Sequence, residues 1–551
     1  MSLLPDRTGG RLRSAAGASR WPTRRTLLWL LLWLAPVTAH AQAACVAEKS
    51  PPAPNAEILV GDWGAGPHNR RWYPATTTGL AAADIPRLTL RWVFVHPQGG
   101  RLRSQPAVTT DTIYLGSPNG SVFALDPSDG CPRWQVPGPA GVRTALVLVD
   151  LPQGRRLFYG DEDGAVVARD ARNGALLWRE RLDPHPDAKI TAAPAYHAGR
   201  LYVGISALEV LRAANPLYDC CTFRGGVAAL DAVSGERLWY TPTIPTPARA
   251  QGRRGLIGTR FGPAGAPVWN TPTIDAARGQ LYVGTGQNYT RPTTPGSNAV
   301  WALALADGAL RWRRQLLADD AWNIGCVTPL SFNCPAQAGP DLDIGAAVML
   351  LGSGAQQRLI VGQKTGEVYA LSPTDGAVHW HRRLGRGGPL GGVHWGMASD
   401  GERLYVPISD ADLKVLIFRG AAPPGPPQPA LNALDARTGE LRWRQPDAPC
   451  ATGNCAAGMS APPTATPAAI FAGSVSGQLR AYAPTDGRVL WQTDTAVAFP
   501  EAGSGAHGGA IDVDGPVVAG GLVLIQSGYA GLFAGGNVLL AYGVEPATPA
   551  P

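Results

Sequence analysis

The sequence predicts an all-β chain that folds as an eight-bladed β-propeller, in which each blade is a four-stranded antiparallel sheet. Three observations support this prediction: a repeated segment that ends in Trp, a Gly at a fixed place within it, and a strand-like apolar run before most copies. Copies spaced by tens of residues are typical of propellers and other repeat folds. The repeats end 42 to 73 residues apart, at Trp92 (a degenerate copy), Trp134, Trp178, Trp239, Trp312, Trp380, Trp443 and Trp491.

The copy ALDAVSGERLW shows what one repeat contributes to a blade. An alternating strand ends at Asp231, and Gly235 supplies a tight turn that needs a positive φ. The next strand carries Trp239, which we expect to pack against the neighbouring unit. Runs such as GRLYVGI, upstream of most copies, supply another pair of strands. Each unit therefore has four strands, and eight units describe the propeller.

The last strand bears on how the ring closes. Residues 537–544 read NVLLAYGV, and no Trp copy follows them. We expect this strand to complete a blade whose outermost strand comes from residues 85–94, near the other end of the propeller sequence.

The composition suits one large β domain. The 551 residues are 45% hydrophobic, which is enough for a sizeable core, and 68 Gly, 51 Pro and 17 Trp against four Met favour a turn-rich β protein. We assign residues 61–545 to the propeller, with a linker at 42–60 and a tail at 546–551.

Residues 1–41 are typical of a signal peptide. An Arg-rich start precedes an apolar run at 27–34 and the small-residue sequence Ala39-His40-Ala41. The run is too short to span a bilayer, so we expect a periplasmic or secreted protein without a membrane span. Arg24-Arg25 resembles a twin-arginine signal, and an ordinary secretory signal is the alternative.

The basic character of the chain comes largely from this segment. Residues 1–41 hold six Arg and one acidic residue, which leaves 42 basic and 40 acidic residues in the remainder. A nearly neutral mature chain gives no basis for a nucleic-acid partner.

All eight cysteines lie beyond residue 41, and an even count in an exported chain predicts disulfides. No CxxC is present, which excludes a c-type haem attachment site in this chain and argues against a cysteine zinc knuckle. Close spacing suggests Cys326–Cys334 and Cys450–Cys455, which leaves Cys45 with Cys131 and Cys220 with Cys221.

The segment 201–239 carries residues that lie outside the repeat. An apolar strand at 201–205 ends in Ser206 and Glu209, and a loop then delivers the adjacent Cys220 and Cys221. Because this loop occurs once, whereas the repeat recurs along the chain, we look for chemistry here.

These repeats, A-x-D-x-x-x-G-x-x-x-W, resemble those of the pyrroloquinoline quinone (PQQ) dehydrogenases. The stretches CCTFRGGVAALDAVSGERLW and GGAIDVDGPVVAGGLVLIQSGYA are most similar to the polyvinyl alcohol dehydrogenase type. The resemblance implies an exported quinoprotein that oxidises an alcohol, polymeric or secondary, and passes electrons to a separate cytochrome c. The alternative is a propeller without enzymatic activity, acting as an assembly scaffold or binding protein, because scaffolds use the same blade.

The resemblance also assigns residues to a PQQ site. PQQ is a flat ring with three carboxylates and an ortho-quinone. A disulfide between Cys220 and Cys221 would cover one face of the ring and Trp269 the other. Arg143, Thr191 and Ser206 match the positions that bind the carboxylates, and Lys364 matches the position beside the quinone oxygens. The alternatives are unrelated disulfides for the two cysteines, a blade-packing role for Trp269 and a solvated turn for Lys364.

The metal that the resemblance implies is Ca²⁺, which takes carboxylate and amide oxygens. Glu209 matches the carboxylate ligand, and Asp343 is a further candidate. The amide ligand lies in GTGQN, where Gln287 and Asn288 are both possible.

The catalytic base would be an aspartate that removes the hydroxyl proton while hydride passes to the quinone. If the insertion ending at Gly339 is skipped, Asp343 falls into the catalytic register, with Asp341 behind it; otherwise Asp320 is nearest. Surface carboxylates without a catalytic role are the alternative. His394 and His507 lie in loops that would line the pocket or serve as hydrogen-bonded structural residues.

Overall fold

The computed structural model describes residues 45, 49–253, 258–327, 332–411, 425–447 and 457–545. The predicted signal peptide, parts of the linker, the Cys450–Cys455 pair and the tail lie outside the described residues. In the described part of the chain, no helix has the length and apolar character needed to cross a membrane.

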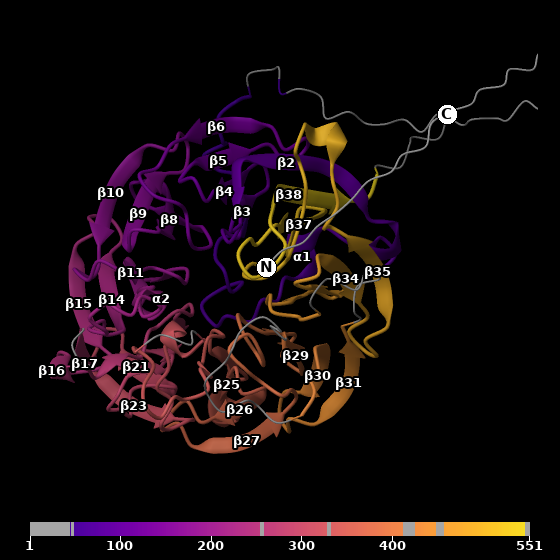
Figure 1. Ribbon diagram of the computed structural model, residues 1–551. Coiled ribbons are helices and arrows are strands. Elements are labelled where there is room, and N and C mark those ends of the chain that lie inside the picture. Colours follow the sequence, from indigo (N-terminus) through magenta and orange to yellow (C-terminus); the bar gives the residue numbers. More distant parts are fainter. Residues whose placement is uncertain are drawn as a thin grey trace, which may run out of the picture. The chain divides into compact units, whose positions relative to one another are not determined.

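The described strands form eight antiparallel blades that follow one another in chain order around a ring, as predicted (Figure 1). Blades 1 and 3 differ from the prediction by carrying a fifth strand. Blade 1 contains β1 (Ile58–Val60), β3 (Ala107–Thr109), β4 (Ile113–Gly116), β5 (Val122–Leu125) and β6 (Pro132–Val136), and blade 2 contains β7 (Val147–Leu151), β8 (Gly154–Gly160), β9 (Ala165–Asp170) and β10 (Leu176–Arg181). Blade 3 contains β11 (Ala188–Lys189), β12 (Ala195–His197), β13 (Arg200–Ala207), β14 (Gly226–Asp231) and β15 (Arg237–Pro242), and blade 4 contains β19 (Thr273–Asp275), β20 (Gln280–Gly284), β22 (Ala299–Ala304) and β23 (Leu310–Gln315).

The remaining blades have four strands each. Blade 5 contains β24 (Met349–Leu351), β25 (Arg358–Gly362), β26 (Glu367–Leu371) and β27 (Val378–Arg383), and blade 6 contains β28 (Ala398–Ser399), β29 (Arg403–Ile408), β30 (Ala430–Asp435) and β31 (Leu441–Pro446). Blade 7 contains β32 (Thr464–Ala465), β33 (Ile470–Gly473), β34 (Gln478–Tyr482) and β35 (Val489–Asp494), and blade 8 contains β36 (Val517–Ala519), β37 (Leu522–Ser527), β38 (Gly536–Gly543) and β2 (Thr89–Gly100).

Small elements connect the blades. The pairs β16 (Arg249–Arg253) with β17 (Thr259–Gly262) and β18 (Ala264–Gly265) with β21 (Asn288–Thr290) are two-stranded. The helices are α1 (Ala75–Thr78) and α2 (Glu209–Arg212), with 3₁₀ turns at Ile85–Arg87, Ile324–Val327, Gly354–Gln356 and Pro500–Ala502.

The repeat tryptophans join each blade to the next, which confirms the predicted contact. The indole N–H of Trp239, for example, donates to the carbonyl of Leu305 at 3.2 Å, and the ring covers Gly308. Gly308 has φ of +72°, and a Cβ there would lie 2.5 Å from the ring, so the position needs glycine for two independent reasons. The same contact recurs at Trp92 with Gly130, Trp134 with Gly174, Trp178 with Gly235, Trp312 with Gly376, Trp380 with Gly439 and Trp443 with Gly487.

The ring closes as predicted. Strand β2, near the start of the described chain, pairs antiparallel with β38 near its end, Val93 facing Leu540. Trp491 of blade 7 then donates its indole N–H to the carbonyl of Leu88 at 2.9 Å. The eighth blade is therefore built from both ends of the propeller sequence.

Three predicted disulfides are present: Cys45–Cys131, Cys220–Cys221 and Cys326–Cys334. The first fastens the linker to blade 1, and the third closes the insertion that precedes blade 5.

Candidate functional site

A cavity of about 500 Å³ lies where loops of several blades converge. In an antiparallel blade, the loop before the first strand and the loop between the second and third strands lie at the same end of the sheet. The cavity residues come from these loops, or from strand ends beside them, in blades 2, 3, 4, 5, 6 and 8. Those singled out from the sequence are Arg143, Thr191, Ser206, Trp269, Gln287, Asp341, Asp343, Lys364 and His394.

One wall of the cavity offers hydrogen-bond donors suited to anionic groups. The Arg143 Nε donates to the Thr191 hydroxyl at 3.2 Å, and the Thr191 and Ser206 hydroxyls lie 3.2 Å apart. Glu162 pairs with the Arg143 guanidinium at 2.9 Å. Burial, followed by the nearby Arg103, lowers the pKa of Arg143 to about 10, so its side chain stays charged at neutral pH.

A second part of the cavity wall is organised around Asp343. One carboxylate oxygen accepts the Trp269 indole N–H at 3.0 Å and lies 3.4 Å from the Lys364 ammonium; the other accepts the Gln287 backbone N–H at 2.7 Å. The Lys364 Nζ also lies 5.3 Å from the centre of the Trp269 ring. A Cβ on Gly345 would lie 1.9 Å from that ring, so glycine is required where the chain passes the indole. Asp343, Trp269 and Lys364 thus form one connected unit.

Asp341 shares Lys364 with Asp343, at 3.5 Å from the ammonium. Burial raises the pKa of Asp341 to about 8, against the opposing effect of Lys364. Burial alone would lower the pKa of Lys364, but Asp341 and Asp343 raise it, so Lys364 is protonated at neutral pH.

Asp320 is fully buried and is not among the residues that line the cavity. Its carboxylate accepts the backbone N–H groups of Asp341 and Leu342 at 3.0 and 2.8 Å. It also accepts the side-chain amide of Asn298 at 2.9 Å. Asp320 therefore holds the segment that presents Asp341 and Asp343.

The two candidate amide ligands differ in their hydrogen bonds. The Asn288 side chain is engaged at both ends: it accepts from the Thr294 N–H at 2.8 Å and donates to the Ala264 carbonyl at 3.1 Å. The Gln287 side chain lines the cavity, and its Oε1 is buried without a hydrogen-bond partner among the described residues. A buried unpaired carbonyl oxygen is costly unless a ligand or ion completes it, which favours Gln287 over Asn288 as the metal ligand.

Glu209 is fully buried at the start of α2. Its carboxylate accepts the backbone N–H groups of Thr222 and Phe223 at 2.8 and 2.9 Å. Burial, together with the charges of Asp343, Glu209 and Asp341, raises the pKa of the cavity residue Tyr289 well above its usual value. Glu209 itself is not among the residues that line the cavity.

The oxygens available near Tyr289 suit a hard cation. Within the described residues, no three His, Cys, Asp or Glu side chains converge on one point as a ready-made metal cluster. Carboxylates combined with the unpaired Gln287 oxygen nevertheless make an oxygen donor set of the kind that Ca²⁺ takes.

The chain is similar to known proteins over most of its length. A family model described as "Glucose/ethanol/alcohol dehydrogenase, beta-propeller domain" matches residues 62–330, and one described as "Outer membrane protein assembly factor BamB" matches residues 296–540. The polyvinyl alcohol dehydrogenase of a Pseudomonas species is 41% identical over 508 residues, 88% of this chain and 76% of that protein. The chain belongs to the PQQ-dependent alcohol dehydrogenase family.

Other relatives extend the comparison. A polyvinyl alcohol dehydrogenase of Sphingopyxis sp. strain 113P3 is 38% identical over 491 residues, 85% of this chain and 74% of that protein. The crystal structure of a quinohaemoprotein alcohol dehydrogenase from Comamonas testosteroni superposes with a TM-score of 0.65 at 17% identity, over 91% of this chain and 82% of that one. At this identity the superposition shows the shared fold.

The predicted Cys220–Cys221 disulfide is buried. The two cysteines are 2% and 0% exposed, and neither is among the residues that line the cavity. They belong to an apolar cluster that also contains Phe223 and Tyr289, whose rings stack 6.2 Å apart. Of the buried residues in this cluster, Ala207 and Tyr289 line the cavity.

Several cavity residues were not predicted. Tyr289, Trp322, Arg386 and Tyr529 lie on the wall, as does Asp512, whose pKa burial raises to about 6. The repeat could not reveal them, because they come from loops far apart in the sequence; the apolar surroundings of Asp512 in GGAIDVDG were the one available signal. His394 lines the cavity and hydrogen-bonds Ser460 at 2.7 Å, whereas His507 is not among the lining residues.

Proposed function

We propose that this chain is an exported, PQQ- and Ca²⁺-dependent dehydrogenase that oxidises an alcohol and passes the electrons to a separate cytochrome c. The observation that carries the proposal is the connected unit of Asp343, Trp269 and Lys364, beside the unpaired Gln287 oxygen, in one cavity of sufficient size. Membership of the family supports the cofactor class, and the predicted signal peptide supports export.

The residues present fit the proposed cofactor. Arg143, Thr191 and Ser206 supply donors for its carboxylates, and the Trp269 indole supplies a flat apolar surface for its ring. Gln287, Glu209 and Asp343 would supply oxygen ligands for the cation. When bound, PQQ supplies a two-electron acceptor, and Ca²⁺ supplies a Lewis acid.

Asp343 is the base that we assign to the hydroxyl proton. The carboxylate lines the cavity, so it is within reach of a bound alcohol, and its two oxygens are oriented by Trp269, Lys364 and the Gln287 N–H. Asp320, which we predicted as the alternative base, acts on this scheme by holding the segment that presents Asp343.

A large apolar part of the wall is suited to the carbon skeleton of the substrate. Leu390, Trp395 and Phe533 face the cavity. These side chains exclude water from the reacting groups, and they place few polar restraints on the alcohol. A secondary or polymeric alcohol is compatible with such a wall.

The scaffold alternative draws support from the match of residues 296–540 to the assembly-factor model. That match covers blades, which scaffolds and dehydrogenases share. A scaffold has no need for a buried lysine between two aspartates, so we favour the enzyme.

The test is reconstitution of the purified mature protein with PQQ and Ca²⁺, followed by quinone absorbance and dye-linked oxidation of primary, secondary and polymeric alcohols. We expect stoichiometric quinone binding and turnover of at least one alcohol. Binding without turnover of any alcohol would count against Asp343 as the base, and absence of binding would favour the scaffold.

A further inference from the structure

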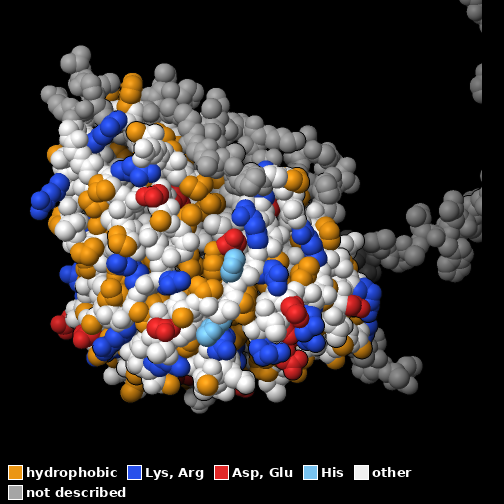
Figure 2. Space-filling view, turned by 90° about the horizontal axis from the view of Figure 1, so that it is seen from below, with side chains coloured by type: hydrophobic (Ala, Val, Ile, Leu, Met, Phe, Trp, Pro, Cys, Tyr) orange, Lys and Arg blue, Asp and Glu red, His pale blue; other side chains and the backbone are white. Residues whose placement is uncertain are grey.

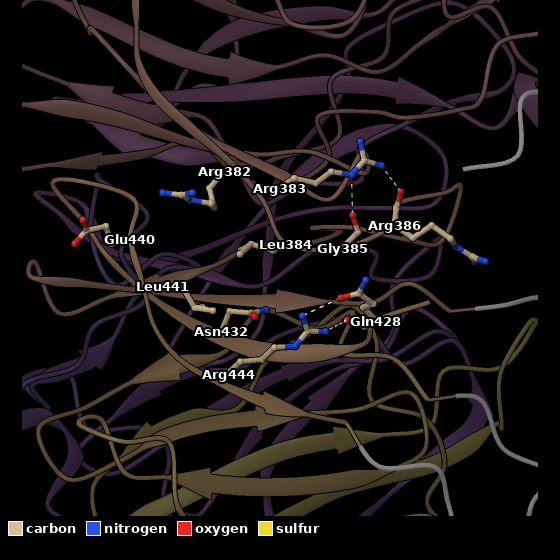
Figure 3. A pocket seen from close by; sticks show the side chains of 10 residues that line it. All are labelled: Arg382, Arg383, Leu384, Gly385, Arg386, Gln428, Asn432, Glu440, Leu441 and Arg444. Atoms are coloured by element: carbon tan, nitrogen blue, oxygen red, sulfur yellow. Dashed lines mark hydrogen bonds between the residues drawn. The ribbon is translucent and has the colours of Figure 1, made fainter. Parts of the chain in front are cut away.

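A second groove, of about 520 Å³, lies between blades 5 and 6 and shares Arg386 with the central cavity. Figure 2 shows the molecule from below relative to Figure 1, which is the side on which β27 lies. On this face Lys and Arg side chains (blue) are more prominent than Asp and Glu side chains (red). The groove is lined on one side by the end of β27 and the residues that follow it, and on the other by β30 and β31 (Figure 3). Four of its lining residues are arginines: Arg382, Arg383, Arg386 and Arg444.

Two of these guanidinium groups are held in place from opposite sides of the groove (Figure 3). Arg383 donates to the carbonyls of Gly385 and Arg386 at 3.2 and 2.8 Å. Arg444 donates to the side-chain and backbone oxygens of Gln428, both at 3.0 Å. Orientation by fixed acceptors reduces the side-chain entropy that a ligand would otherwise have to remove.

The charges of Arg382, Arg383 and Arg444 are not neutralised within the described residues. The partners of Arg382, Arg383 and Arg444 are carbonyl and amide oxygens, and no described carboxylate lies within salt-bridge distance of them. Glu440 is the one acidic residue among the lining residues. Each guanidinium also keeps N–H donors that its protein acceptors do not use, and a planar set of such donors matches phosphate and carboxylate oxygens.

We propose that this groove is a binding site for a multivalent oxyanion of the phosphate or polycarboxylate class, held between Arg383 and Arg444 and supported by Arg382. The proposal does not depend on the dehydrogenase activity, because the groove is complete without PQQ. Its ligand would bridge two blades and so stabilise their contact.

The groove and the central cavity are separated by one chain segment. Arg386 lines both, and Asp410, buried at the end of blade 6's second strand, accepts the backbone N–H groups of Arg386 and Gly387 at 2.6 and 2.9 Å. The same carboxylate accepts the N–H of Gln428 at 3.0 Å. Asp410 thus ties the cavity wall to the residue that orients Arg444, and an oxyanion in the groove would bind next to that wall.

The test is calorimetric titration of the full mature protein, free of PQQ, with inorganic phosphate and separately with citrate, in a KCl buffer of constant ionic strength. We expect saturable binding of at least one of the two. Phosphate alone would indicate a phosphate-class ligand, citrate alone a polycarboxylate, and both would show a general oxyanion site.

Variants locate the binding. Arg383→Gln and Arg444→Gln should each weaken it about tenfold or more, as expected for loss of a charge-assisted hydrogen bond. Arg383→Lys keeps the charge but lacks the planar fork, and should weaken binding less than Arg383→Gln. Arg314→Gln is the matched control, since Arg314 is an exposed arginine on β23 at the register that Arg382 has on β27, outside the groove.

Binding of neither probe would overturn the proposal. So would equal weakening by Arg314→Gln, which would reduce the effect to general surface charge, or unchanged binding in both Arg383→Gln and Arg444→Gln. Melting temperatures of all variants in KCl alone show whether each is folded before its titration is compared.

Discussion

The blade contacts and the central cavity both place a tryptophan ring over a glycine, but for different purposes. Between blades, the indole N–H of Trp312 donates to the carbonyl of Pro373, and the ring covers Gly376. In the cavity, the indole N–H of Trp269 donates to the carboxylate of Asp343, and the ring covers Gly345. A carbonyl acceptor makes the first contact purely structural. A carboxylate acceptor makes the second an orienting contact for a group that can take a proton.

In this fold, packing over a glycine fixes the position of a tryptophan ring. The group that accepts the indole N–H then determines the role of that tryptophan. If this is right, changes at the two places should affect different measurements.

Asp343→Asn should reduce kcat in the reconstituted enzyme by about a thousandfold, within the range expected for loss of a general base. The amide keeps the shape and can still accept from Trp269, so quinone binding should persist. Dye-linked turnover and quinone absorbance measure the two quantities. Asp319→Asn, a change at an exposed carboxylate just before Asp320, is the control and should leave kcat unchanged. Equal turnover in Asp343→Asn and wild type would refute the assignment.

Gly376→Ala should lower the free energy of unfolding by about 3 kcal/mol, because it combines a positive φ with overpacking. A Cβ there would lie 2.8 Å from the Trp312 ring. Gly279→Ala is the control: its φ of +61° is similar, but nothing lies within 4 Å of the added Cβ, so it should cost about 1–2 kcal/mol. Urea unfolding midpoints compare them, and identical losses would mean that the indole yields without cost.

Gln287→Leu should weaken Ca²⁺ binding by about tenfold, since it removes one oxygen ligand while keeping the volume. Asn288→Ala should instead lower stability, because it breaks hydrogen bonds with Thr294 and Ala264. Calorimetric titration with Ca²⁺ and thermal melting separate the two effects. The reverse pattern would make Asn288 the ligand.

Asp514 is a buried carboxylate that accepts the side-chain amide of Gln526 at 3.0 Å. Burial raises its pKa to about 7 from 3.8, so the folded state binds the proton more tightly than the unfolded state does. The charge of Asp514 therefore reduces stability progressively as pH rises from about 4 to 7. Asp514→Asn should gain on the order of 1 kcal/mol relative to wild type between pH 5 and 8. If the free energies of unfolding of Asp514→Asn and wild type changed in parallel with pH over this range, the raised pKa of Asp514 would be contradicted.

The ring could be predicted in detail from the sequence because the same turn and contact signals recur in each blade. Gly235 and Trp239 predicted a turn and a contact that recur around the ring, and strands Arg200–Ala207 and Gly226–Asp231 lie within about a residue or two of where alternation predicted them. The fifth strands of blades 1 and 3 had no such repeated signal.

The site was predictable only as far as local motifs reached. The choice between Gln287 and Asn288 depends on which amide Thr294 and Ala264 already engage, and that is decided by packing. Cys220 and Cys221 share an apolar cluster with Tyr289, which lies far away in the sequence. The roles of Asp320 and Asp512 likewise arise from contacts between distant loops.

The pairing of β2 with β38 has a consequence for biosynthesis. The strand that opens the eighth blade leaves the ribosome early, and its partner emerges only after nearly all the remaining propeller residues have been made. Until then, β2 has an unpaired edge, to which chaperones or incorrect strands can bind. The cavity encircled by the blades is complete only when the last strand is in place, so a nascent chain that stops short of β38 should be a target for proteolysis.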